Sequence, residues 1–178
     1  QTSNMTFPNA TTDHSWYDLF AGSLSIERNS LDYKQYPISG RKQFLVAQYV
    51  TGTEKYMPSP ITDMGSFDRK VHSWLQMKGE WEQYKTISPY FNLGFMSELV
   101  LSSKNLMNNY TASVLQAPAF TPTPHSQIVF NEAFRANQYV AFGLSPILKF
   151  SKLLHFRLDM YGFAPLYEIK KEEVWNNN

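Results

Sequence analysis

The sequence has no cysteine, almost no net charge and no long apolar run, and each absence excludes a class of protein. Without cysteine, the 178-residue chain can hold neither a disulfide scaffold nor a thiolate metal site. The net charge is +1 and the basic residues are scattered, so no clustered basic face indicates a nucleic-acid partner. No run approaches the roughly 18 apolar residues that a transmembrane helix needs.

The motifs that usually carry catalysis are also missing from the sequence. There is no P-loop, no G-x-G-x-x-G and no G-x-S-x-G, since the serine-containing segments after Gly22 and Gly143 lack the second glycine. The four histidines are far apart, and we interpret them as ordinary side chains rather than metal ligands. We therefore expect no catalytic residue, no cofactor and no metal in this chain.

What the chain does contain is a large share of aromatic side chains. Phe, Tyr and Trp make up 16% of its residues, against 17% for all charged residues together. The mean hydropathy is nevertheless low, at −0.39. Such a composition fits either a large all-β core or a membrane barrel with aromatic girdles at both interfaces.

Apolar and polar residues alternate with a period of two along much of the chain, which is typical of β-strands. The pattern is clearest over residues 71–83, where Val71, Leu75 and Trp81 alternate with charged or polar side chains. It predicts strands at residues 15–28, 41–52, 71–83, 91–101, 110–117, 138–150 and 154–163, with long connections at 53–70 and 118–137.

Two architectures fit such strands, because the apolar face can meet either a protein core or lipid. The run at 71–83 is longer than the roughly 5–6 residues of a usual soluble strand, whereas a tilted membrane strand needs about 9–11. Strand length and aromatic load therefore favour the barrel. The alternative is a soluble β-sandwich or jelly-roll binding module in which Trp16, Trp74 and Trp81 line a ligand face.

The polar strand faces carry charges that a narrow barrel lumen would pair across strands, because an unpaired buried charge is costly. Paired carboxylates such as Glu80 and Glu82 fit this network better than acid–base catalysis. The residues expected in the network are Lys78, Glu80, Glu82, Glu98, Arg157 and Asp159.

Three segments resemble barrels of the bacterial surface-antigen superfamily, which includes outer-membrane assembly factors and two-partner secretion transporters. Residues 27–40 contain N-x-L-D followed by Y-P-x-x-G, which is similar to an inter-strand turn of that family. Residues 134–137 resemble the arginine-bearing tip of a loop that folds into the lumen, although Ala136 stands where the family usually has glycine. Residues 156–162 resemble the following strand.

These resemblances imply a structural latch inside the lumen, in which the loop arginine pairs with an acidic residue on the following strand. Carried over to this sequence, Arg135 would pair with Asp159. Glu98 is a second candidate for the acidic position. A charge-assisted pair of this kind would hold the loop inside the barrel.

A wider resemblance covers roughly residues 15–167 and is carried by Tyr90-Phe-Asn-Leu-Gly94, by the proline-rich stretch 117–124 and by residues 134–139. These resemble the C-terminal barrel region of Bacteroidetes-type patatin-like phospholipases. Such proteins join a patatin hydrolase domain, with a Ser–Asp dyad, to a surface-antigen-type barrel.

This resemblance implies an all-β fold, an antiparallel outer-membrane β-barrel of which the chain supplies about seven strands. We expect residues 1–14 to be a leading loop or linker, 15–170 to form barrel strands and loops, and 171–178 to be a loop or truncated end. The chain would then be an internal segment, with the hydrolase and its nucleophile upstream in the same polypeptide.

The expected role follows from that placement. In the cell outer membrane of a Gram-negative bacterium, the segment would anchor, and help to deliver or orient, a patatin-like lipid acyl hydrolase. Its partners would be outer-membrane lipid and the upstream patatin domain, with no nucleic acid. A third alternative is the barrel of an outer-membrane protein assembly or secretion factor.

Overall fold

The computed structural model describes residues 14–57, 68–104, 110–151 and 154–167, and they form one antiparallel sheet of seven strands. The all-β prediction is therefore confirmed, and the sheet is open rather than closed on itself. No helix in the described ranges is long and apolar enough to cross a membrane. The elements are β1 (His14–Asn29), β2 (Gly40–Met57), β3 (Asp68–Ser88), β4 (Phe91–Ser102), α1 (Tyr110–Leu115), the 3₁₀ turn η1 (Glu132–Phe134), β5 (Gln138–Lys149), β6 (His155–Arg157) and β7 (Met160–Tyr167).

The first four strands pair in sequence order, and β4 pairs directly with β5. β2 and β3 are longer than predicted, so the predicted connection 53–70 shrinks to the ten residues between Met57 and Asp68. Residues 58–67 and 171–178 lie outside the described residues. So does the expected leading loop 1–14, apart from His14, which begins β1.

The prediction of a strand at 110–117 is wrong, because residues Tyr110–Leu115 form the helix α1. β4 and β5 are hydrogen-bonded to each other, so no strand edge is free between them to pair with this segment. As a helix, the segment instead packs Ala112 against Val50 and Trp74 on one face of the sheet.

The strand predicted at 154–163 is divided into β6 and β7, which pair with β5 one after the other. The division lies opposite Pro146 of β5. Leu158 donates its N–H to the Pro146 carbonyl, but proline has no N–H to return, so the ladder is interrupted there. The interruption places Asp159 between the two strands.

Residues 27–40, which resemble an inter-strand turn of surface-antigen barrels, include the turn between β1 and β2. Asp32 Oδ1 accepts the N–H groups of Tyr33, Ile38 and Ser39 at 3.0–3.2 Å. Burial alone would raise the pKa of Asp32, but these donors outweigh it and lower that pKa. Gly40 closes the turn at φ 101°, where a Cβ would lie 2.2 Å from the Ser30 carbonyl oxygen.

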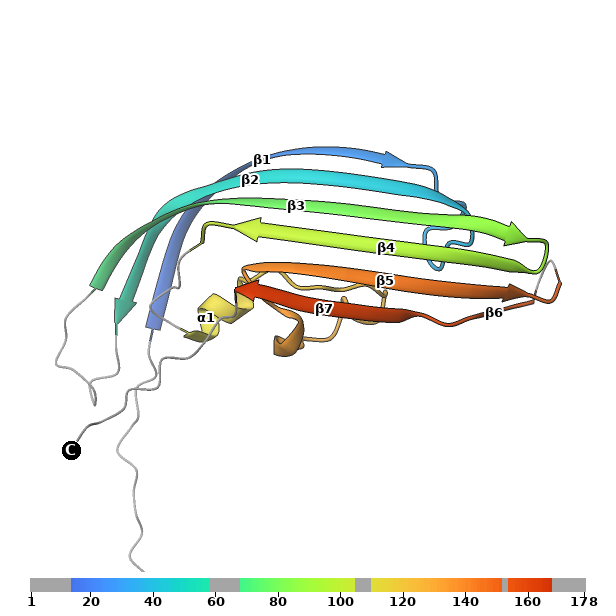
Figure 1. Cartoon of the computed structure of the whole chain (residues 1–178). Helices are drawn as coiled ribbons and strands as arrows, with labels where there is room; N and C mark the ends of the chain where they lie inside the picture. The colour runs from blue at the N-terminus through green and yellow to red at the C-terminus, as the bar shows by residue number, and fades with distance from the viewer. Residues whose placement is uncertain (1–13, 58–67, 105–109, 152–153, 168–178) are drawn as a thin grey trace, which may run out of the picture.

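The sheet is strongly arched, and α1 and the connection between β4 and β5 lie on its concave side (Figure 1). A small apolar cluster lies between this connection and the concave face, formed by Val100, Phe120, Ala136, Tyr139 and Ala141. Because successive side chains of a strand point to opposite faces, the neighbours of the concave residues point outward. The register then shows which outward-pointing residues of neighbouring strands lie side by side on the convex face.

Candidate functional site

The convex face carries most of the large apolar side chains of the sheet, and they are exposed. One row across the strands reads Ile26, Leu45, Gly79, Leu99 and Val140, each opposite the next in the register. Other exposed apolar residues on outward positions are Phe20, Leu24, Tyr49, Val71, Leu75, Met77, Trp81, Phe95, Leu101, Phe142, Leu144 and Leu148. We call this set, together with the row, the apolar band.

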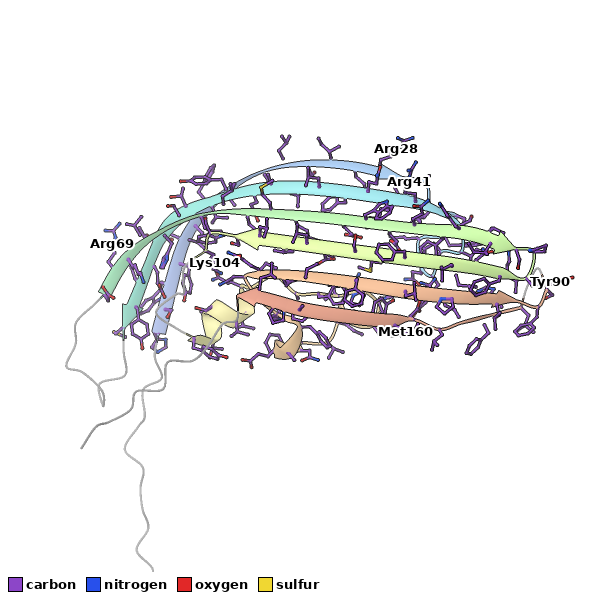
Figure 2. All side chains as sticks on the ribbon, in the orientation of Figure 1. Arg28, Arg41, Arg69, Tyr90, Lys104 and Met160 are labelled. Carbon is purple, nitrogen blue, oxygen red and sulfur yellow. The ribbon has the colours of Figure 1, made fainter. Side chains whose placement is uncertain are left out.

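Charged residues border the apolar band at both ends of the first three strands. Asp18, Lys55 and Arg69 lie at one end, near the open ends of β2 and β3. Arg28, Arg41 and Lys85 lie at the other, and the labelled arginines can be followed in Figure 2. The band is thus an apolar strip between two charged borders.

The concave face has a different character, because many of its charged residues are buried or half-buried and form ion pairs. Arg157 is the centre of the largest group: its Nε donates to Asp159 Oδ1 at 2.6 Å, its Nη1 to the Pro37 carbonyl at 2.8 Å and its Nη2 to Tyr84 Oη at 2.9 Å. Ser145 donates a further bond to Asp159 at 2.5 Å. One guanidinium therefore ties the β1–β2 turn to β3 and to the β6–β7 junction.

A second group lies in the middle of the concave face. Lys42 pairs with Glu80 at 2.8 Å, and Lys78 pairs with Glu98 at 3.0 Å. Tyr139 donates its hydroxyl to Glu98 at 2.5 Å. The expected charge network across strands is thus present, and Glu98 lies inside it.

A third group lies near α1, around the fully buried Glu54. Tyr17 donates to Glu54 Oε1 at 3.1 Å, and His72 Nε2 lies 2.8 Å from Oε2. Just beyond β4, the Lys104 ammonium lies over the Trp74 ring, and burial lowers the pKa of Lys104 to about 8. Within the described ranges no three His, Cys, Asp or Glu side chains gather as a metal site.

A cavity of about 240 Å³ remains between the concave face, the Tyr36–Pro37 turn and residues 121–127. Its charged lining mixes four basic with three acidic side chains: Lys34, Lys42, Lys78, Arg157, Glu80, Glu82 and Glu98. The turn and the 121–127 segment start from opposite ends of the sheet, and both fold over the same polar face. Two segments of the chain therefore cover part of the concave side.

The predicted latch between Arg135 and Asp159 is not formed. Arg135 Nη1 donates to the carbonyls of Leu115 and Ala117 at 2.9 and 3.0 Å, and its guanidinium lies over the Phe130 ring. These acceptors belong to its own connection, whereas Asp159 pairs with Arg157, two residues away. Arg157 was thus expected in the charge network, but not as the ion-pair partner of Asp159.

The three tryptophans of the binding-module alternative do not share a face. Trp16 and Trp81 are exposed on outward positions, whereas Trp74 is buried on the concave side against Val50. No single ligand face can contain all three. This arrangement removes the specific aromatic surface on which that alternative depended.

Arg135 still has a testable structural role, which is to hold the connection between α1 and β5 together. Arg135→Ala would remove two charge-assisted bonds to main-chain carbonyls, which are stronger than neutral hydrogen bonds. We expect limited proteolysis to cut the 115–135 region of the full-length protein several-fold faster than in the wild type. An unchanged cleavage rate, or equally fast cleavage of the Arg69→Ala control, would contradict this role.

Comparisons of the chain with protein-family models, curated proteins and solved structures found no match. The resemblance to surface-antigen barrels and patatin-like phospholipases therefore depends on the sequence segments alone.

Proposed function

We propose that this chain is part of a β-barrel embedded in an outer membrane, with the convex face against lipid and the concave face toward the lumen. The observation that carries the proposal is the inverted polarity of the sheet. Leu24 and Val71 are 74% and 72% exposed, while Glu54 and Glu98 are 0% and 4% exposed. Soluble proteins bury such apolar side chains and expose such carboxylates.

The dimensions of the apolar band support the same proposal. On β3 it runs from Val71 to Trp81, which is about 33 Å at roughly 3.3 Å per residue. With a strand tilt of roughly 40°, this length corresponds to a height of about 25 Å, the height of the apolar band on outer-membrane barrels. The charged borders at Arg69 and Lys85 would then lie at the two membrane surfaces.

An open sheet cannot stand in a membrane, because the unpaired backbone groups of its edge strands would meet lipid. In the proposed barrel, β1 and the β6–β7 edge pair with further strands. The segments folded over the concave face then occupy the lumen. Within that lumen the charges of the ion pairs Lys42–Glu80, Lys78–Glu98 and Arg157–Asp159 neutralise each other pair by pair.

The finer part of the proposal is that the barrel anchors and orients a patatin-like lipid acyl hydrolase upstream in the same polypeptide. Its support is the sequence resemblance over residues 15–167, together with the 27–40 segment, which lies between two strands as its counterpart does in surface-antigen barrels. The alternative of an assembly or secretion barrel shares the same membrane face and differs only in what it is joined to.

The test is fractionation of Gram-negative cells that express the full-length protein, followed by detergent extraction and gel mobility with and without boiling. We expect outer-membrane location and a mobility that changes on heating. A freely soluble protein without such a change would remove the barrel and favour the soluble β-sandwich.

The hydrolase part has its own readout, which is release of fatty acid from phospholipid vesicles by the purified full-length protein. Acyl hydrolysis by a membrane-located protein would support the patatin-like parent. A membrane-located protein without acyl hydrolysis would remove that part and favour the assembly or secretion barrel.

A further inference from the structure

A groove of about 680 Å³ crosses the convex face inside the apolar band. Its walls include Ile26, Leu45, Trp81 and Leu99, and it passes over Gly79. A Cβ at Gly79 would meet only Leu45 Cδ1, at 3.9 Å, so the space above this glycine is open. By contrast, the Phe142 ring covers Gly162 on the same face, where a Cβ would lie 2.3 Å from Phe142 Cζ.

The groove runs across the strands from β1 to β5 and has a polar end. The row from Ile26 to Val140 crosses four strand spacings, about 19 Å at roughly 4.8 Å each. Arg28 and Gln43, which are opposite each other in the register, line the β1 end. The groove is therefore long and apolar, with a hydrogen-bonding end at the charged border.

Arg41 adds a second guanidinium beside this end. It lies two residues from Gln43 on β2 and faces the same side of the sheet, and Figure 2 shows it close to Arg28. Both arginines are exposed, and within the described ranges no carboxylate lies within ion-pair distance of either. Two unpaired guanidiniums at a membrane border are suited to binding an anionic group.

We propose that this groove binds one anionic phospholipid, with an acyl chain over Gly79 and the phosphate held by Arg28 and Arg41. This inference rests on the proposed membrane face. Guanidinium groups bind phosphate oxygens through paired N–H donors, and the apolar walls match a hydrocarbon chain. A free phosphate would contact only the two arginines and leave the groove empty. The apolar groove and the arginines at its end together therefore fit a lipid.

The test uses the full-length protein in detergent micelles, with bound lipid counted by native mass spectrometry. The probes are phosphatidylglycerol, phosphatidylcholine with the same chains, and glycerol phosphate without chains. We expect phosphatidylglycerol to bind at least about tenfold more tightly than phosphatidylcholine. Both lipids carry the phosphate, but the choline cation of phosphatidylcholine offsets its charge and is repelled by the two arginines. Glycerol phosphate should not displace it.

Two variants separate the two parts of the site. Gly79→Val fills the groove, and Arg28→Gln combined with Arg41→Gln removes the charges, so each should weaken phosphatidylglycerol binding about tenfold or more. The matched controls are Gly22→Val, at a glycine that is also open but outside the groove, and Arg69→Gln at the opposite border. Neither control should change binding, and heat-dependent gel mobility checks that all variants fold.

Equal binding of the two phospholipids, displacement by glycerol phosphate, or equal loss in the controls would overturn the lipid site. If the protein is membrane-located and shifts on heating, such a result leaves the proposed barrel intact. A soluble protein without a heat-dependent shift would overturn both.

Discussion

Arg157→Met is expected to destabilise the folded protein by about 3 kcal/mol, the lower end for breaking a buried ion pair, because it leaves the half-buried Asp159 carboxylate without a cation. The same change removes the donors to the Pro37 carbonyl and to Tyr84. The β1–β2 turn would therefore lose one of its attachments to the concave face, while Asn92 still donates to the Ile38 carbonyl at 2.7 Å. The measurement is the free energy of unfolding in urea of the full-length protein, folded into detergent micelles.

The control for this change is Arg69→Met, which removes an exposed arginine with no ion pair among the described residues. Exposed substitutions of this kind usually change stability by at most about 0.5 kcal/mol. If Arg157→Met costs no more than Arg69→Met, Arg157 does not hold the turn and the junction together.

A double variant tests whether the loss comes from the uncompensated carboxylate. Adding Asp159→Asn to Arg157→Met removes the uncompensated charge, so the double variant should be more stable than Arg157→Met alone. Residues in one ion-pair network show such coupling, typically about 0.5–3 kcal/mol. Strictly additive losses would show that the two side chains act independently.

The second large effect is expected from a charge placed in the middle of the apolar band. Met77→Arg should destabilise a membrane barrel by about 2–4 kcal/mol, because its outward position would place the guanidinium near the bilayer midplane. The Met77 side chain is already 41% exposed, so in a water-soluble protein the same change would have almost no effect. Unfolding in urea from lipid vesicles measures the difference.

Ile87→Arg on the same strand is the matched control. Ile87 is 60% exposed and lies beyond the charged border at Lys85, where a lipid-facing charge costs only about 0–1 kcal/mol. A membrane face therefore predicts a large loss for Met77→Arg and a small one for Ile87→Arg. Equally small losses at both positions would indicate that the convex face meets water.

The strands could be predicted from the sequence because their alternation is visible over long runs. Residues 71–83 show it without any knowledge of their neighbours, and β3 indeed contains them all. The segment 110–117 is too short to distinguish the two-residue period of a strand from the roughly 3.6-residue period of a helix. Only the direct pairing of β4 with β5 excludes it from the sheet. The interruption between β6 and β7 likewise comes from Pro146 on another strand.

The side-chain partners could be predicted only in part. Glu98 and Arg157 were expected among the buried charges because they occupy polar strand positions. Which arginine meets Asp159 depends on how the α1–β5 connection folds, and Arg135 finds its acceptors within that connection. The groove over Gly79 depends on the register that places this glycine between Leu45 and Leu99.

The most direct test of the membrane face is a spin-label scan along β3, in a 178-residue sequence that has no cysteine of its own to remove. Single cysteines at positions 73–79 of the full-length protein in lipid vesicles would each carry a nitroxide. Its collisions with oxygen, which concentrates in lipid, and with a water-soluble nickel chelate would then be compared.

We expect oxygen access to peak at Leu75 and Met77 and to fall at Gln76 and Lys78, with a period of two, while the nickel chelate is excluded from the convex positions. High nickel access at Leu75 and Met77 would contradict the proposal that the convex face meets lipid.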